Sequence, residues 1–179
     1  MTKSCKKLIT EIRNAQTEIL RRAPYRDASL VPNPGASPGA IIAAERRVGR
    51  ALPPSYRSFL AQHDGWARFF EGASLLGTRA LGQPRYAELL ASMFGNNPVS
   101  PAARGAARWR SLIPFGMDTQ VTTVFAFNPL VQRPDGELEV VAWVNEIGLR
   151  SPSFPDFLET VLELCHSELG QWSGVQKSA

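Results

Sequence analysis

The sequence predicts an α+β protein built as one domain with an N-terminal helical arm. Three observations lead to this fold class. Apolar residues recur at helical spacing in several segments, runs rich in β-branched and aromatic residues lie in the second half, and a proline-rich stretch follows the first helical segment. The 179 residues fit one domain with a short appendage, and 44% apolar with 20% charged residues is an ordinary globular composition.

The first predicted helix covers residues 3–22, and its apolar stripe consists of Leu8, Ile12, Ala15 and Ile19. Pro24 ends this helix, and further prolines favour an extended connector after it. We therefore expect an arm over residues 1–36, a main domain over 37–170 and a frayed tail over 171–179. The arm is expected to dock weakly or to serve a partner, so that removal of residues 1–23 leaves a cooperatively folding body.

The main domain is expected to begin with two helices. Ser37 is a good N-cap for a helix over residues 38–49, because its hydroxyl can accept a hydrogen bond from the first turn. Pro54 suits the first turn of the next helix, and Gly65 is expected to be its left-handed stop. Two further helices are expected over residues 86–95 and 153–170.

Strands are expected over residues 69–76, 112–115, 121–127 and 138–144. The last two flank the turn signal Pro134-Asp135-Gly136, in which glycine accepts a positive φ. They are therefore predicted to form a hairpin with a long loop.

Charge is distributed unevenly along the chain. Residues 1–26 carry a net charge of +5, residues 27–110 carry +5, and residues 111–179 carry −6. Such a split indicates either polar recognition of a partner or solvated faces that differ by chance.

An acidic candidate surface follows from this distribution, because Asp135, Glu137, Glu139 and Glu146 bracket one predicted hairpin strand. Glu137 and Glu139 are two residues apart on a strand and are expected to face the same side. Charge beside a turn also protects a strand edge, which is the alternative reading. We expect a reversal of both residues to lysine to leave stability nearly unchanged.

An aromatic cluster follows the predicted turn at residue 65 and consists of Trp66, Phe69 and Phe70. It indicates either core packing or a partly exposed anchor for a protein partner. Trp66 and Phe70 are therefore also candidate partner-binding residues.

Residues that bear catalytic or metal-binding chemistry are sparse. The thiols and imidazoles, which lack paired ligands at short spacing, are Cys5, His63, Cys165 and His166. His63 and Asp64 lack a Gly-x-Ser-x-Gly nucleophile elbow. We expect no catalytic residue, no cofactor, no metal and two reduced thiols.

Other recognition motifs are incomplete. Gly72 and Gly77 have the spacing of a phosphate loop, but no lysine follows them. Arg104, Arg108 and Arg110 are too few to predict direct nucleic-acid binding. We expect no signal peptide and no membrane span, and hence a cytoplasmic protein.

A family resemblance appears in three segments. The first is "PGAIIAAERRVGRALPPSYRSFLAQHDGW", the second is "LIPFGMD", and the third is "SPSFPDFLETVL". In this order they resemble the SUKH superfamily (the Smi/Knr family) over roughly residues 37–165. An asparagine is common in the family where Asp64 stands, residues 81–110 are longer than usual, and the N-terminal arm lies outside the match.

The resemblance implies a mixed, mostly antiparallel sheet flanked by helices, and a function without catalysis. Many bacterial members resemble immunity proteins that bind and neutralise a cognate polymorphic toxin, and eukaryotic relatives act in cell-wall signalling. We therefore expect a protein partner, with a toxin first and a nuclease as one option. The alternative is a cytoplasmic regulatory or scaffold protein without a toxin partner, and an enzyme ranks last. The chain is expected to be a monomer or a weak dimer.

Overall fold

A computed structural model describes residues 4–24, 28–96, 111–144 and 147–175. Its helices are α1 (Cys5–Arg22), α2 (Pro38–Val48), α3 (Pro54–Gln62), α4 (Pro84–Asn96) and α6 (Phe154–Val175). Its strands are β1 (Trp66–Phe70), β2 (Ala73–Leu75), β3 (Ile113–Met117), β4 (Thr123–Gln132), β5 (Leu138–Val144) and β6 (Ile147–Ser151). The predicted α+β fold class is confirmed.

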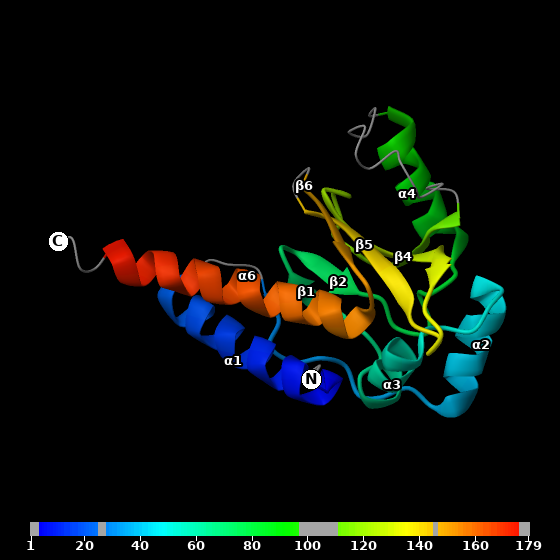
Figure 1. The fold of residues 1–179 in the computed structure, drawn as a ribbon, viewed down its shortest axis with the longest axis horizontal. Helices are drawn as coiled ribbons and strands as arrows, with labels where there is room; N and C mark the ends of the chain where they lie inside the picture. The colour runs from blue at the N-terminus through cyan, green and yellow to red at the C-terminus, as the bar shows by residue number, and fades with distance from the viewer. Residues whose placement is uncertain (1–3, 25–27, 97–110, 145–146, 176–179) are drawn as a thin grey trace.

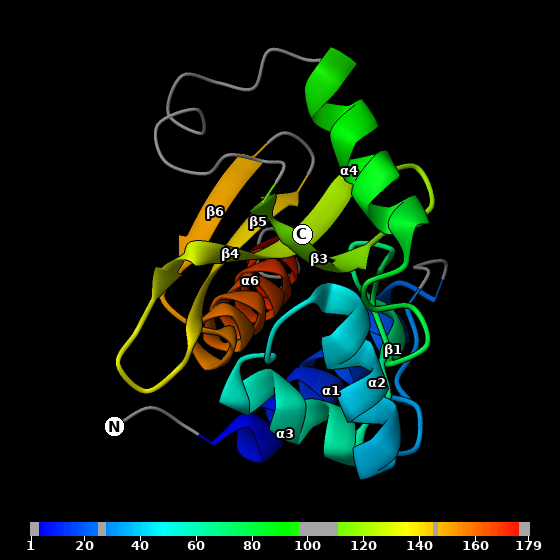
Figure 2. The ribbon, with the colours of Figure 1, turned by 90° about the vertical axis from the view of Figure 1, so that its right-hand side faces the viewer.

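The strands form one six-stranded sheet in the order β1-β2-β3-β4-β5-β6, and each neighbouring pair is antiparallel. Helices α1, α3 and α6 lie on one side of this sheet, and α4 lies beside β3 on the other side (Figures 1 and 2). Two regions of strand differ from the sequence prediction. The segment around residues 69–76 is a β1–β2 hairpin, and β6 was not predicted because Gly148 and Arg150 interrupt its short apolar pattern.

The start of α2 follows the prediction closely. The Ser37 hydroxyl accepts a hydrogen bond from the Ala40 N–H at 3.2 Å, and Gly49 ends the helix with φ of 80°. Two other helix ends differ from the prediction. Helix α3 is capped at His63, before Gly65, and α6 continues through Gly170 to Val175.

Gly65 has a different role from the predicted helix stop. Its φ is 88°, and a Cβ there would lie 2.7 Å from the Gly77 nitrogen. The adjacent Asp64 carboxylate accepts hydrogen bonds from the backbone N–H and the hydroxyl of Thr78. The 64–65 turn is therefore fixed against the residues after β2, which is a structural role for the Asp-Gly pair.

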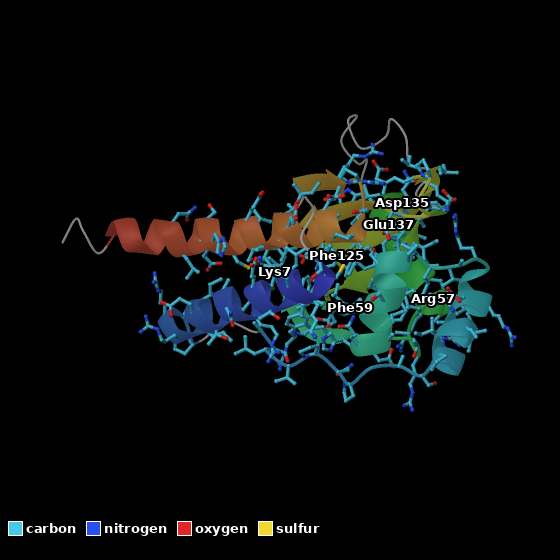
Figure 3. All side chains as sticks on the ribbon, turned by 60° about the horizontal axis from the view of Figure 1, so that its bottom comes forward. Lys7, Arg57, Phe59, Phe125, Asp135 and Glu137 are labelled. Carbon is cyan, nitrogen blue, oxygen red and sulfur yellow. The ribbon has the colours of Figure 1, made fainter. Side chains whose placement is uncertain are left out.

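The main core lies between the sheet and the helices on its α1, α3 and α6 side. Aromatic rings dominate it, as Phe59 and Phe125 illustrate in Figure 3. The ring centroids of Phe115 and Phe127 are 4.1 Å apart, and those of Phe125 and Phe157 are 4.9 Å apart. Such contacts add to the burial of large apolar surfaces, so these rings fix the helices on the sheet.

Helix α1 belongs to this same core, whereas the sequence suggested an arm that docks weakly or serves a partner. It packs alongside α6 (Figures 1 and 2). Its buried apolar residues, all members of the main core cluster, are Leu8, Ile9, Ile12, Ala15 and Ile19. The connector prolines separate α1 from α2 along the chain, but they do not separate it from the core.

Candidate protein-binding surface

The distal end of the β4–β5 hairpin is exposed along most of its length. We define the hairpin end as residues 129–136, which comprise the last residues of β4 and the following turn. The Arg133 N–H donates to the Glu137 carbonyl at 2.8 Å, and the Gly136 N–H donates to the Arg133 carbonyl at 3.0 Å. Gly136 has φ of 87°, so the predicted Pro-Asp-Gly turn is present and ordered by these bonds.

Two adjacent apolar side chains stand exposed at this hairpin end. Leu130 is 59% exposed and Val131 is 42% exposed. Arg133 and Asp135 form an ion pair beside them, with Nη2 and Oδ2 3.2 Å apart. Exposed apolar side chains with charged groups nearby also occur in protein-binding surfaces, which have an apolar centre and a polar rim.

The hairpin end is also held by Arg50, which follows the C-cap of α2. The Arg50 guanidinium donates hydrogen bonds to the Pro129 carbonyl and to the Gln132 side-chain oxygen, each at 3.4 Å. Gly136 approaches Pro54 at the start of α3. These contacts brace the projecting turn, so a partner would meet a preorganised surface.

Glu137, although part of the predicted acidic surface, is a structural residue. It is only 9% exposed, and its carboxylate accepts hydrogen bonds from the Ser55 N–H at 2.8 Å and the Ser55 hydroxyl at 2.6 Å. The N-cap of α3 is Pro53, which supplies no side-chain hydrogen bond. Glu137 therefore caps the start of α3 from a distant part of the chain, where a negative charge also suits the helix dipole.

Glu139 is engaged in a second internal network. Its carboxylate accepts hydrogen bonds from Arg150 Nε at 2.8 Å, from Arg150 Nη2 at 2.7 Å and from Asn128 Nδ2 at 2.7 Å. Burial raises the pKa of Glu139, but the hydrogen bonds from Arg150 and Asn128 outweigh it and leave the pKa below its usual value. Leu138 and Val140 face the main core, so Glu139 between them lies on the opposite face of the sheet. Glu137 contacts the start of α3, which is on the core side. The expectation that the two glutamates share a face is wrong.

The remaining candidate residues are divided between the surface, the core and the part of the chain outside the described residues. Asp135 is exposed near Glu137 at the hairpin end (Figure 3). Trp66 is fully buried, and its indole N–H donates to the Ser29 carbonyl at 2.6 Å. Phe70 is half-buried against the main core. Glu146 lies outside the described residues, as do Arg104, Arg108 and Arg110.

Leu130 and Val131 were not predicted from the sequence to be contact residues. Their only signal is an apolar pair directly after Pro129, close to a turn rich in polar residues. The pattern cannot distinguish this pair from buried strand residues, because exposure depends on how far β4 extends beyond its neighbours.

The two glycines with the spacing of a phosphate loop have structural roles. Gly72, with φ of 74°, lies in the β1–β2 turn, while Gly77 packs against Asp64 beyond β2, so the two do not form a phosphate loop. Among the described residues, no three His, Cys, Asp or Glu side chains are grouped to hold a metal ion. Within the same residues, no helix combines the length and apolar character needed to cross a membrane.

Comparison with known protein families gives one match. Residues 35–160 match the SMI1 / KNR4 family (SUKH-1), a range that extends from the connector before α2 into α6. No match was found among curated proteins. The matched range contains the whole sheet and the hairpin end, whereas α1 lies before it.

Proposed function

Because this chain belongs to the SMI1 / KNR4 family (SUKH-1), we propose that it is a non-catalytic immunity protein that binds and neutralises a cognate toxin. The family match over residues 35–160 is the observation that carries the proposal. The proposed site of action is the cytoplasm. In this function the protein supplies a rigid surface, and inhibition comes from covering the toxin's active site or substrate channel.

The hairpin end is the proposed contact surface. Leu130 and Val131 supply apolar area that is available without unfolding any element. Arg133 and Asp135 form the polar rim, and Arg50, which follows α2, holds the end of β4 through the Pro129 carbonyl. A projecting, braced turn of this kind can enter a concave active site, because little conformational entropy is lost when it docks.

A nuclease is one chemical class of toxin consistent with the acidic character of residues 111–179. Its active cleft would be basic to hold phosphates, and an acidic surface would speed the encounter. However, Glu137 and Glu139 already accept internal hydrogen bonds, so Asp135 is the exposed carboxylate among the described candidates. We therefore assign the main contribution to the apolar pair and a secondary one to Asp135.

The decisive experiment is capture of the partner from the source cell. The full chain carrying an affinity tag is expected to co-purify with a toxic protein, which mass spectrometry identifies. Purified chain added at equal concentration is then expected to abolish the toxin's activity and to protect cells that express it. Capture of a partner without toxic activity would support the regulatory or scaffold function instead.

The contact surface can be tested with the captured partner. A double change of Leu130→Ser and Val131→Ser is expected to weaken binding about 10- to 30-fold, the effect of losing a modest apolar anchor. Leu164→Ser is the matched control, because Leu164 is an exposed apolar residue on α6, away from the hairpin end. Equal affinities for the two variants would exclude the hairpin end as the contact surface.

A further inference from the structure

A group of arginines, which we call the arginine surface, lies on and beside the C-terminal half of α2 and consists of Arg46, Arg47, Arg50 and Arg79. The first two are in the last turn of α2, the third follows its C-cap, and the fourth belongs to the turn before α4. Arg50 is partly exposed and the other three are exposed. Figure 2 shows α2 between the end of the β4–β5 hairpin and the segment that leads to α4.

Contacts of Arg47 hold the two parts of the arginine surface together. Its guanidinium donates to the carbonyls of Thr78 and Leu81, which lie on either side of Arg79 in the chain. Gly82 has φ of 72°, and a Cβ there would lie only 2.8 Å from the Arg47 Cβ. The turn that carries Arg79 is therefore packed directly on the end of α2.

The positive charge of this surface is largely uncompensated. None of its four guanidinium groups is paired with a carboxylate of the described residues. Arg47 and Arg50 donate to neutral oxygens, namely backbone carbonyls and one side-chain amide. The carboxylate of α2, Glu45, accepts from the Leu52 N–H at 3.1 Å and lies 3.8 Å from Arg57 Nε.

Two negative contributions offset only part of this charge. The Asp64 carboxylate contacts the turn through Thr78, from which it accepts two hydrogen bonds. The C-terminal end of the α2 dipole adds about half a negative charge. One carboxylate and half a charge leave most of the four positive charges available to a partner.

The arginine surface is continuous with the hairpin end, because Arg50 Nη1 donates to the Pro129 carbonyl at 3.4 Å. Apolar side chains are exposed beside it. Ile42, one turn before Arg46 on the same face of α2, is 40% exposed, and the exposed apolar pair of the hairpin end lies beyond Arg50. Arginine together with apolar side chains is typical of protein contacts, whereas phosphate binding requires only the positive charge. The composition therefore favours a protein partner over a nucleic acid.

We propose that the arginine surface contacts an acidic region of the protein partner, beside the area that the hairpin end contacts. Resting on the proposed function, this partner is the toxin, and its carboxylates accept hydrogen bonds from the guanidinium groups. The basic cleft of a nuclease would be repelled here, so a nuclease would have to meet α2 with an acidic part of its surface. The arginine surface thus selects partners by charge.

Two blocked peptides test this inference on the isolated full chain, with binding followed by changes in backbone NMR shifts. The first alternates three glutamates with three leucines, and the second has glutamines in place of the glutamates. We expect saturable shifts in α2 and in residues 77–82 with the acidic peptide at millimolar concentration, and about tenfold weaker binding of the neutral peptide. No saturable shift in these segments, or equal binding of both peptides, would overturn the inference.

A tetranucleotide of deoxythymidine separates protein recognition from nucleic-acid binding. Its three phosphates give it the same charge as the acidic peptide. We expect it to bind more weakly at the same salt concentration, because it gains only the general attraction of a basic surface. Equal or tighter binding of the tetranucleotide would assign this surface to nucleic acid and overturn the inference.

Variants locate the groups that bind the acidic peptide. The double change Arg46→Gln with Arg79→Gln should weaken its binding about fivefold, the effect of losing two exposed charge pairs. The matched control is Arg13→Gln with Arg21→Gln, because both of these residues are exposed on α1 and the change in net charge is the same. Equal weakening by the two double variants would show a general effect of net charge and overturn the assignment to α2.

The same variants distinguish this inference from the proposed function. The captured toxin should associate about fivefold more slowly with Arg46→Gln/Arg79→Gln than with the control variant at low salt. If the toxin is captured and inhibited but associates equally with both variants, the inference fails and the proposed function stands. Because the peptides do not involve the toxin, their failure to bind is separate from a failure to capture the partner.

Discussion

Deletion of residues 1–23 is expected to abolish cooperative folding, although the family match begins only at residue 35. Helix α1 supplies four large apolar residues to the main core, namely Leu8, Ile9, Ile12 and Ile19. Their contacts lie along α6, whose Val161 and Leu162 belong to the same cluster. The deletion would expose the faces of α6 and of the sheet that α1 now covers.

The magnitude follows from the buried side chains. Complete burial of a residue such as leucine or isoleucine is worth about 1.5–3 kcal/mol, so four of them amount to about 6–12 kcal/mol. The contact buries comparable apolar surface on the remaining body, which would lose that burial when α1 is removed. Because whole domains have stabilities of about 5–15 kcal/mol, the loss is comparable with the entire free energy of unfolding.

The assay is urea unfolding followed by circular dichroism on the full chain, the deletion variant and two point variants. Ile12→Ala is expected to lower the free energy of unfolding by about 2–5 kcal/mol. Asn14→Ala is its control on the exposed face of the same helix and should change it by less than about 0.5 kcal/mol. A deletion variant that unfolds cooperatively at nearly the urea midpoint of the full chain would refute the reasoning.

Cys5 offers a second measure of α1 docking that requires no deletion. Burial, with a smaller contribution from the charge of Glu137, raises the pKa of the Cys5 thiol from 9.0 to about 11. A rise of about two units lowers the reactive thiolate fraction at pH 8 about hundredfold. Cys5 should therefore react with iodoacetamide about hundredfold more slowly in the native protein than in urea. Equal rates would show that α1 is undocked in solution.

Three further predictions concern the body of the protein. Phe157→Ala should lower the free energy of unfolding by about 3–5 kcal/mol in urea titrations, and a loss below about 1 kcal/mol would show a misplaced helix face. Glu137→Gln should lower the free energy of unfolding by about 1–3 kcal/mol because it weakens the cap of α3. Asp135→Asn should lower it by less than about 0.5 kcal/mol, and equal losses for the two variants would contradict the capping role. The pKa of Glu139 is lowered on folding, so its contribution to stability is present above pH 4.5 and is lost as pH falls through its lower folded value. Arg150→Gln should reduce the slope of the free energy of unfolding against pH below pH 4.5. An unchanged slope would show that the Glu139–Arg150 ion pair is not its source.

The local elements were largely predictable because their signals lie within a few residues of each other. Ser37 and Gly49 cap the two ends of α2, and the pattern of α1 places Ile12 on the apolar face. What the apolar face of a helix packs against is harder to predict. An amphipathic stripe shows that a helix buries one face, but it does not show whether that face meets the chain's own core or another protein.

Helix and strand ends were less predictable because a glycine can end a helix, form a turn or lie within a helix. Gly65 has the left-handed conformation expected of a helix stop, yet it serves the turn that packs against Gly77. Gly170 lies within α6, where the cost of one glycine in a helix is only about 1 kcal/mol. Strand β6 lacks a clear alternating pattern, so its pairing with β5 emerges from the sheet as a whole.

The candidate surface was the least predictable feature, and Glu137 shows the physical reason. In the sequence it is one of several carboxylates near a turn, yet its partner Ser55 is 82 residues away. Reversal of Glu137 to lysine would place an ammonium group at the positive end of the α3 dipole and leave the Ser55 donors without their acceptor. The earlier expectation of nearly unchanged stability is therefore replaced by a clear loss of stability.

The net charge of a segment does not show how many of its charged groups are free to attract a partner. The net charge of −6 over residues 111–179 suggests long-range attraction of a basic partner. Arg133 and Arg150 are already counted in this net charge, and since they pair with Asp135 and Glu139, the excess of acidic groups lies away from these two ion pairs. Screening at physiological salt, with a Debye length of about 8 Å, weakens the remainder. If the hairpin end is the contact surface proposed above, recognition there depends mainly on short-range contact by Leu130 and Val131, because salt does not screen the burial of apolar surface.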